Sequence, residues 1–181
     1  ILQAEPGDLF VTRNAGNIVP PFAQANGGVS SAVGYAVLAL GVTDIIVCGH
    51  SGCGAMEGLL KPGALDEMPN VAAWLRHSHA AQGVGTKCYP DRGDRDRLRV
   101  LTLENIVCQL AHLRTHPSVA AGIARGTIAL HGWYVDIHSG AILALDERKG
   151  HFIPVRDDTP LPIALPHAAR LAAHQTLDRS A

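Results

Sequence analysis

The sequence predicts an α/β fold: a single domain over residues 1–181, with a central, mostly parallel β-sheet flanked by helices and an antiparallel strand at one edge. A helical pattern that ends at Leu40 is followed by the continuous apolar run of residues 43–48. A glycine-rich turn, residues 49–54, comes directly after that run. This order is typical of open α/β sheets, which bind ligands at the carboxyl ends of their strands.

The first element expected is a short strand over residues 8–13, where apolar and polar residues alternate after the turn signal Pro6-Gly7. The following stretch, residues 14–28, is rich in Asn, Gly and Pro and is therefore expected to be irregular.

A helix is expected next, because Ser30 or Ser31 can cap a helical pattern that continues through Leu40 and ends at Gly41. Residues 43–48 then begin with β-branched side chains and contain no alternation. This pattern predicts a strand that is covered on both faces.

The remaining elements follow from similar signals, including a hairpin signal at Ser139-Gly140. We expect helices near residues 71–82 and 98–115, the second closed by Pro117, strands over 127–137 and 141–145, and a last helix or loose tail over 166–175.

Composition excludes several classes of partner. The chain has 15 basic and 16 acidic residues and a formal charge of -1, so it lacks the cationic surface that nucleic acids and anionic membranes attract. Its 4 cysteines show no regular spacing, which favours a reducing, cytoplasmic location. No targeting leader and no apolar run long enough to cross a membrane are evident.

The strongest chemical signal is His50-Ser-Gly-Cys53, an imidazole and a thiol on the glycine-rich turn. Nitrogen and sulfur ligands suit zinc, and glycines allow the backbone to bring both side chains to one ion. A metal site needs three or four ligands, however, so a buried cysteine beside a turn histidine explains the same pattern.

Two other interpretations of these glycines are weaker. A hydrolase nucleophile elbow, G-x-S-x-G, would need glycine at the position of Cys53. A dinucleotide-binding loop would need the order G-x-G-x-x-G, whereas the chain has G-x-x-G-x-G.

Segments along most of the chain resemble the β-class carbonic anhydrases, zinc lyases (carbonate dehydratases) that hydrate carbon dioxide. The resemblance is carried, in order, by residues 5–17 (EPGDLFVTRNAGN), 31–42 (SAVGYAVLALGV), 46–55 (IVCGHSGCGA) and 130–140 (LHGWYVDIHSG). Motifs that match in this order are hard to obtain by chance.

The resemblance implies a role for individual residues. His50 and Cys53 match the second and third zinc ligands, and the backbone amide of Gly54 would contact the metal-bound water or bicarbonate. Three further residues match the apolar carbon dioxide pocket, to which a neighbouring subunit contributes: Phe10, Ala15 and Tyr35. The implied reaction is attack of zinc-bound hydroxide on carbon dioxide, in a homodimer or larger homo-oligomer.

The chain departs from the family at its beginning. The family carries a Cys-x-Asp-x-Arg motif before the segment that matches residues 1–7, and this motif supplies the first zinc ligand and an Asp-Arg pair. No segment here matches it, and Cys48, Cys88 and Cys108 are poor substitutes. We therefore expect the domain to lack the family's N-terminal helices and first zinc-ligand strand, as a fragment of a longer active protein would.

Other functions remain open at this point. A chain that is naturally this short would be a catalytically impaired or inactive homologue that acts as an assembly partner. A nucleotide-binding α/β domain is a third, weaker possibility. The histidines outside the turn are interpreted as structural or solvated, and none is selected as a proton shuttle: His77, His79, His112, His116, His131 and His138.

Overall fold

The computed structural model describes residues 4–24, 27–89 and 93–155. Its sheet contains β1 (Asp44–His50), β2 (Ala129–Val135), β3 (Ile142–Asp146) and β4 (His151–Pro154), in the order β1-β2-β3-β4. β1 pairs with β2 in parallel, and the pairs β2-β3 and β3-β4 are antiparallel. The α/β class is confirmed. Two strands pair in the antiparallel direction at the edge, because β4 follows the predicted hairpin and pairs with β3.

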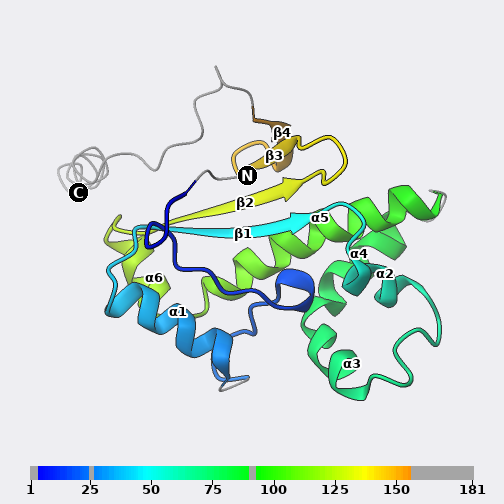
Figure 1. The fold of residues 1–181 in the computed structure, drawn as a ribbon, viewed down its shortest axis with the longest axis horizontal. Coiled ribbons are helices and arrows are strands. Elements are labelled where there is room, and N and C mark those ends of the chain that lie inside the picture. Colours follow the sequence, from blue (N-terminus) through cyan, green and yellow to red (C-terminus); the bar gives the residue numbers. More distant parts are fainter. Residues whose placement is uncertain (1–3, 25–26, 90–92, 156–181) are drawn as a thin grey trace, which may run out of the picture.

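The described helices lie on one side of this sheet (Figure 1). They are η1 (Ala15–Asn17), α1 (Gly28–Leu38), α2 (Gly54–Leu60), α3 (Pro69–Leu75), η2 (Arg76–Ser78), α4 (His79–Cys88), α5 (Asp94–Leu113) and α6 (Pro117–Ala124). α5 crosses the sheet and packs against β1 and β2. No helix of the described residues is both long and apolar enough to cross a membrane.

Glycines on the two parallel strands allow α5 to approach the sheet closely. A Cβ atom on Gly132 would lie 2.9 Å from Cγ2 of Ile106, and Gly49 has a similar contact with the same side chain. Ile106 is fully buried, in a cluster with Val47 and Tyr134. Close packing of this kind fixes the position of the strand ends relative to α5.

The strand predicted over residues 8–13 is wrong, because residues 9–13 are irregular and exposed. A strand requires hydrogen bonds to a neighbouring strand, and within the described residues only β1 to β4 pair with one another. The apolar and polar alternation is real, but it leaves Phe10 and Val11 at 48% and 65% exposure.

β1 is a strand as predicted, but it is not covered on both faces. Val47 and Gly49 are buried against α5, whereas Ile46 and Cys48 point to the opposite face and are exposed. The continuous apolar run therefore misled the prediction of burial, because the second face of the sheet carries no described helix.

Several boundaries also differ from the prediction. α1 begins at Gly28 with Gly27 as its N-cap, and the Ser31 hydroxyl donates to the Gly27 carbonyl inside the helix rather than capping it. The helix predicted near 71–82 is divided into α3, η2 and α4, and Cys88 ends α4. α5 ends at Leu113, before Pro117. Pro117 instead begins α6, where proline suits the first turn. The helix or tail predicted over 166–175 lies outside the described residues.

Candidate active site

The glycine-rich turn joins the carboxyl end of β1 to the start of α2. His50 is the last residue of β1, and Cys53 is the N-cap of α2 with its carbonyl accepting from the Glu57 amide. Gly52 adopts φ +63°, a left-handed conformation that favours glycine. The turn is thus held by a strand end, a glycine conformation and a helix cap.

Ser51 ties this turn to the neighbouring strand. Its amide donates to the Val135 carbonyl over 2.9 Å, and its hydroxyl accepts from the Ile137 amide over 2.9 Å. These bonds fix the backbone that directly follows His50, so the imidazole projects from a constrained position.

His50 is exposed, and its Nδ1 lies 2.9 Å from the Ser51 carbonyl oxygen. Because a carbonyl only accepts hydrogen bonds, this contact places a proton on Nδ1, so that Nε2 is the nitrogen available to a metal in the neutral imidazole. A neutral imidazole with a free Nε2 is the form that binds metals.

Cys53 occupies a different environment, because its side chain is 4% exposed and packs in the cluster that contains Ile18, Met56 and Leu75. This burial also agrees with the alternative interpretation of a core cysteine. Gly54 begins α2, and a Cβ atom there would meet nothing within 4 Å, so the space beside its backbone is open. Its amide is one of the first-turn donors that have no partner within the helix.

The donor set fits zinc in kind but not in number. Catalytic zinc sites use three protein ligands, and the described residues contain no group of three or more His, Cys, Asp or Glu side chains that could hold a metal ion. Cys48 immediately precedes the turn, but its side chain points to the exposed face of β1, whereas Cys108 lies on α5, where burial raises the pKa of its thiol. The residues in hand therefore do not complete a zinc site.

The predicted pocket residues are partly brought together. The rings of Phe10 and Tyr35 lie 6.2 Å apart between centroids, and both are about half exposed. Ala15 begins η1, and its carbonyl accepts from the indole N–H of Trp74 over 2.9 Å. The aromatic pair thus forms an exposed apolar surface rather than a closed pocket within this one chain.

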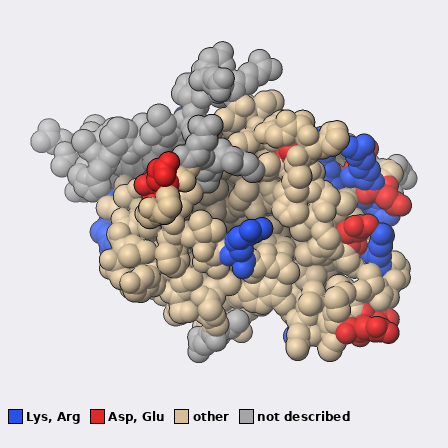
Figure 2. All heavy atoms as spheres, in the orientation of Figure 1, with Lys and Arg blue, Asp and Glu red and all other residues tan. Residues whose placement is uncertain are grey.

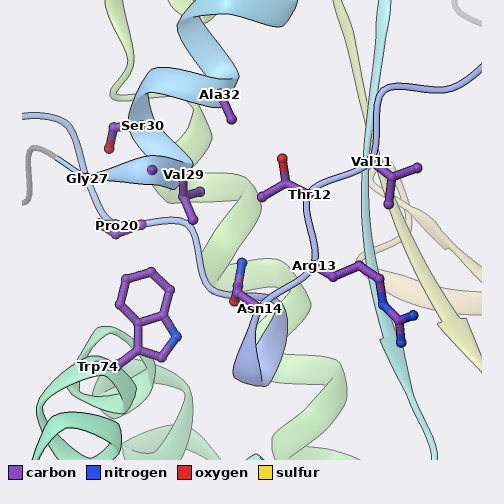
Figure 3. A pocket seen from close by; sticks show the side chains of 11 residues that line it. Val11, Thr12, Arg13, Asn14, Pro20, Gly27, Val29, Ser30, Ala32 and Trp74 are labelled. Carbon is purple, nitrogen blue, oxygen red and sulfur yellow. The ribbon is translucent and has the colours of Figure 1, made fainter.

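A hollow of about 510 Å³ lies among residues 11–14, the start of α1 and Trp74 (Figure 3). Its lining includes Thr12, Asn14, Trp74 and the start of α1, while the Arg13 side chain extends away from the other labelled side chains. None of the predicted site residues is among the described residues that line it. The hollow is therefore separate from the glycine-rich turn.

Sequence reasoning missed a row of buried polar side chains on α5. Asn105 and Gln109 are fully buried, on the helix that was recognised only by its apolar positions. The signal was available, because two amide side chains spaced four residues apart interrupt an otherwise apolar face. Buried amides must be hydrogen-bonded, so such a pair predicts a contact with another backbone segment.

Comparisons with known proteins agree with the resemblance. The family model described as carbonic anhydrase matches residues 1–142. A carbonic anhydrase of Pseudomonas aeruginosa is 48% identical over 157 residues, which are 87% of this chain and 71% of the relative. One from Synechocystis is 48% identical over 147 residues, 81% of this chain and 54% of the relative.

Solved structures give the same result for the fold. The β-carbonic anhydrase CcaA superposes with a TM-score of 0.82 at 45% identity, covering 84% of this chain and 75% of that one. Tetrameric β-carbonic anhydrases from Sordaria macrospora give a TM-score of 0.67 at 28% identity, with 78% and 70% covered.

Proposed function

This chain belongs to the β class of the carbonic anhydrase family, and on that premise we propose that it serves the reversible, zinc-dependent hydration of carbon dioxide to bicarbonate. The observation that carries the proposal is the glycine-rich turn at the carboxyl end of β1, where the His50 Nε2 is left free to bind a metal. Ligand sites of α/β sheets lie at such strand ends.

We assign His50 and Cys53 as metal ligands, with the remaining donor supplied from outside the described residues. Zinc, when bound, would make a water molecule acidic enough to act as a nucleophile near neutral pH. The Gly54 amide is suited to donate a hydrogen bond to an oxygen of bicarbonate, because it starts a helix and the space beside it is open.

Phe10, Ala15 and Tyr35 are proposed to hold carbon dioxide by apolar contact. In this chain alone Phe10 and Tyr35 are too exposed to exclude water. Exposed aromatic surface is typical of subunit interfaces, so we propose that a second copy covers it in a homodimer or larger homo-oligomer. The tetrameric Sordaria relatives support this assembly.

The face over α1, the helix that carries Tyr35, shows few charged side chains (Figure 2). Charged side chains gather toward the end of the molecule where α5 begins, and much of the remaining face shown carries few of them.

The cysteines are all free thiols in the described residues, which supports a reducing, cytoplasmic location.

A second candidate function is an inactive assembly partner. It is favoured by one observation, the incomplete metal donor set within the described residues. Such a chain would keep the family fold and subunit contacts while binding zinc weakly.

Zinc content measured by mass spectrometry, together with proton release on addition of carbon dioxide, tests the proposal. We expect weak zinc uptake by the 181-residue chain, lost in His50→Ala and Cys53→Ser and kept in the control Cys48→Ser. Fusion of a leading segment that carries the Cys-x-Asp-x-Arg motif should give full zinc occupancy and hydration activity.

If the fused chain folds but takes up no zinc, the proposed function is wrong. Near-stoichiometric zinc in the 181-residue chain itself would instead reject the inactive assembly partner.

A further inference from the structure

A row of polar side chains along α5 holds the backbone of residues 16–19. Asn105 Nδ2 donates to the Gly16 carbonyl over 2.8 Å. Gln109 Oε1 accepts from the Val19 amide over 2.9 Å, and His112 Nδ1 donates to the Val19 carbonyl over 2.9 Å. These side chains supply the hydrogen-bond partners that backbone groups outside a sheet or helix would otherwise lack.

The two amides are themselves fixed by further hydrogen bonds. Asn105 Oδ1 accepts from the Ser78 hydroxyl over 2.7 Å and from Gln109 Nε2 over 2.9 Å. Gln109 Nε2 also lies 3.2 Å from the His77 carbonyl. Asn105, Gln109 and Ser78 are fully buried. A buried network in which each group has a partner permits one arrangement and penalises the loss of any member.

The segment held by this row packs directly against the glycine-rich turn. Ile18, which is fully buried, shares a core cluster with Cys53 and Met56. Gly16 lies so close to α2 that a Cβ atom there would be 2.9 Å from Cε of Met56. Residues 16–18 are therefore packed into and against the core cluster in which the Cys53 side chain is buried.

We propose that Gln109 and Asn105 are positioning residues for Cys53, acting through the hydrogen-bonded segment 16–19. They touch no substrate and no metal. Their effect is to hold Ile18 against the thiol, which keeps Cys53 in one place beside the start of α2. The proposal rests on the proposed function only for the role of Cys53 as a metal ligand.

The test is the rate at which Cys53 reacts with N-ethylmaleimide in the native chain, followed by peptide mass spectrometry. Gln109→Leu leaves the Val19 amide without its acceptor, and loss of a buried hydrogen bond weakens local structure. We expect Cys53 to react at least about tenfold faster than in the unmodified chain. The Val19 amide should exchange its hydrogen faster by a similar factor.

The control is Leu145→Ala, which removes packing from the other core cluster, around α5 and the sheet. Although Val19 belongs to this cluster, Leu145→Ala removes none of the hydrogen bonds from Asn105 and Gln109 to residues 16–19, so it reports how much of the change is a general loss of stability. Rates in the two variants are compared after each is corrected for its measured free energy of unfolding.

Gln109→Glu supplies a signature that a general loss of stability does not. An ionised carboxylate accepts from Val19 but cannot donate to Asn105, whereas the protonated acid can do both. We expect fast Cys53 labelling near neutral pH and slower labelling in mild acid. The unmodified chain is measured at each pH, because His77 and His112 flank residue 109 and titrate in the same range.

Equal corrected rates in Gln109→Leu and Leu145→Ala, or a Gln109→Glu profile parallel to that of the unmodified chain, would overturn the inference. Either result leaves the zinc proposal standing. Conversely, absence of zinc from the chain fused to the leading segment would reject the proposed function. The labelling rates would still decide whether Gln109 positions Cys53.

Discussion

Gly49 of β1 and Ile106 of α5 are in such close contact that a Cβ atom on residue 49 would lie 2.9 Å from Cδ1 of the isoleucine. Gly49 immediately precedes His50, so this contact fixes the distance between the carboxyl end of β1 and α5. Only a residue without a side chain allows the approach, because Ile106 is fully buried and has little room to move.

Gly49→Ala is therefore expected to lower the free energy of unfolding by about 1–3 kcal/mol, as overpacking of a core does. Urea denaturation measures the change. Gly34→Ala is the control, because Gly34 lies within α1 and a Cβ atom there meets nothing within 4 Å. Alanine at residue 34 should leave stability unchanged or raise it, and an equal loss in both variants would refute the packing argument.

Gly16→Ala should also destabilise the chain, through both backbone and packing. Gly16 has φ +76°, and its Cβ would lie 2.9 Å from Met56. Gly140 has nearly the same φ, +74°, but open space around it. Both alanine variants carry the cost of a left-handed backbone, about 1–2 kcal/mol, and Gly16→Ala carries the steric contact in addition. Thermal unfolding of the two variants should differ, and coincident transitions would show that Met56 moves aside without cost.

Sequence alone predicted those elements whose signals are local. The β1 strand, the glycine-rich turn and the hairpin around Gly140 were found because periodicity and turn residues report directly on backbone conformation. The segment 8–13 was misassigned because strand formation depends on a partner strand, which no local pattern contains.

The residues of the candidate site also differ in whether the sequence alone could predict them. His50 and Cys53 are adjacent on one turn and could be selected from spacing, although nothing in that spacing indicated that one side chain is exposed and the other buried. Asn105 and Gln109 act on residues about 90 positions away along the chain. Such contacts follow from packing of α5 on the segment 16–20, and only the folded structure gives their partners.

Stability should fall in mild acid because of His112 and His77. Burial lowers the pKa of both imidazoles below the ordinary value of 6.5. In the unfolded chain they take up protons near that value, while in the folded chain they resist protonation until lower pH. The contribution of these neutral imidazoles is thus complete above about pH 7 and is lost as pH falls from about 6.5 toward the lowered values.

Urea denaturation between about pH 7.5 and pH 5.5 measures this loss. His112→Gln should be less stable at neutral pH but show a shallower dependence on pH, because one titrating group is gone. A slope identical to that of the unmodified chain would mean that His112 does not contribute to the acid sensitivity.

The last prediction concerns self-association through the exposed face of α1. Tyr35 and Leu38 are 57% and 76% exposed, and Phe10 adjoins Tyr35, so this helix presents apolar side chains to solvent. Apolar surface of this kind is favourable to bury in a subunit contact and causes aggregation when it is left open. We expect light scattering of the 181-residue chain to show a mass that increases with concentration.

Leu38→Lys should shift that mass toward the monomer, because burying a lysine ammonium in an apolar contact is costly. The matched control is Val107→Lys, on the exposed side of α5, where the valine is 41% exposed and the substitution adds the same charge. Since both side chains lie outside the core clusters, neither change should greatly alter unfolding. If both variants keep the mass of the unmodified chain, α1 is not the contact surface; if both lose it equally, added charge rather than loss of this contact is the cause.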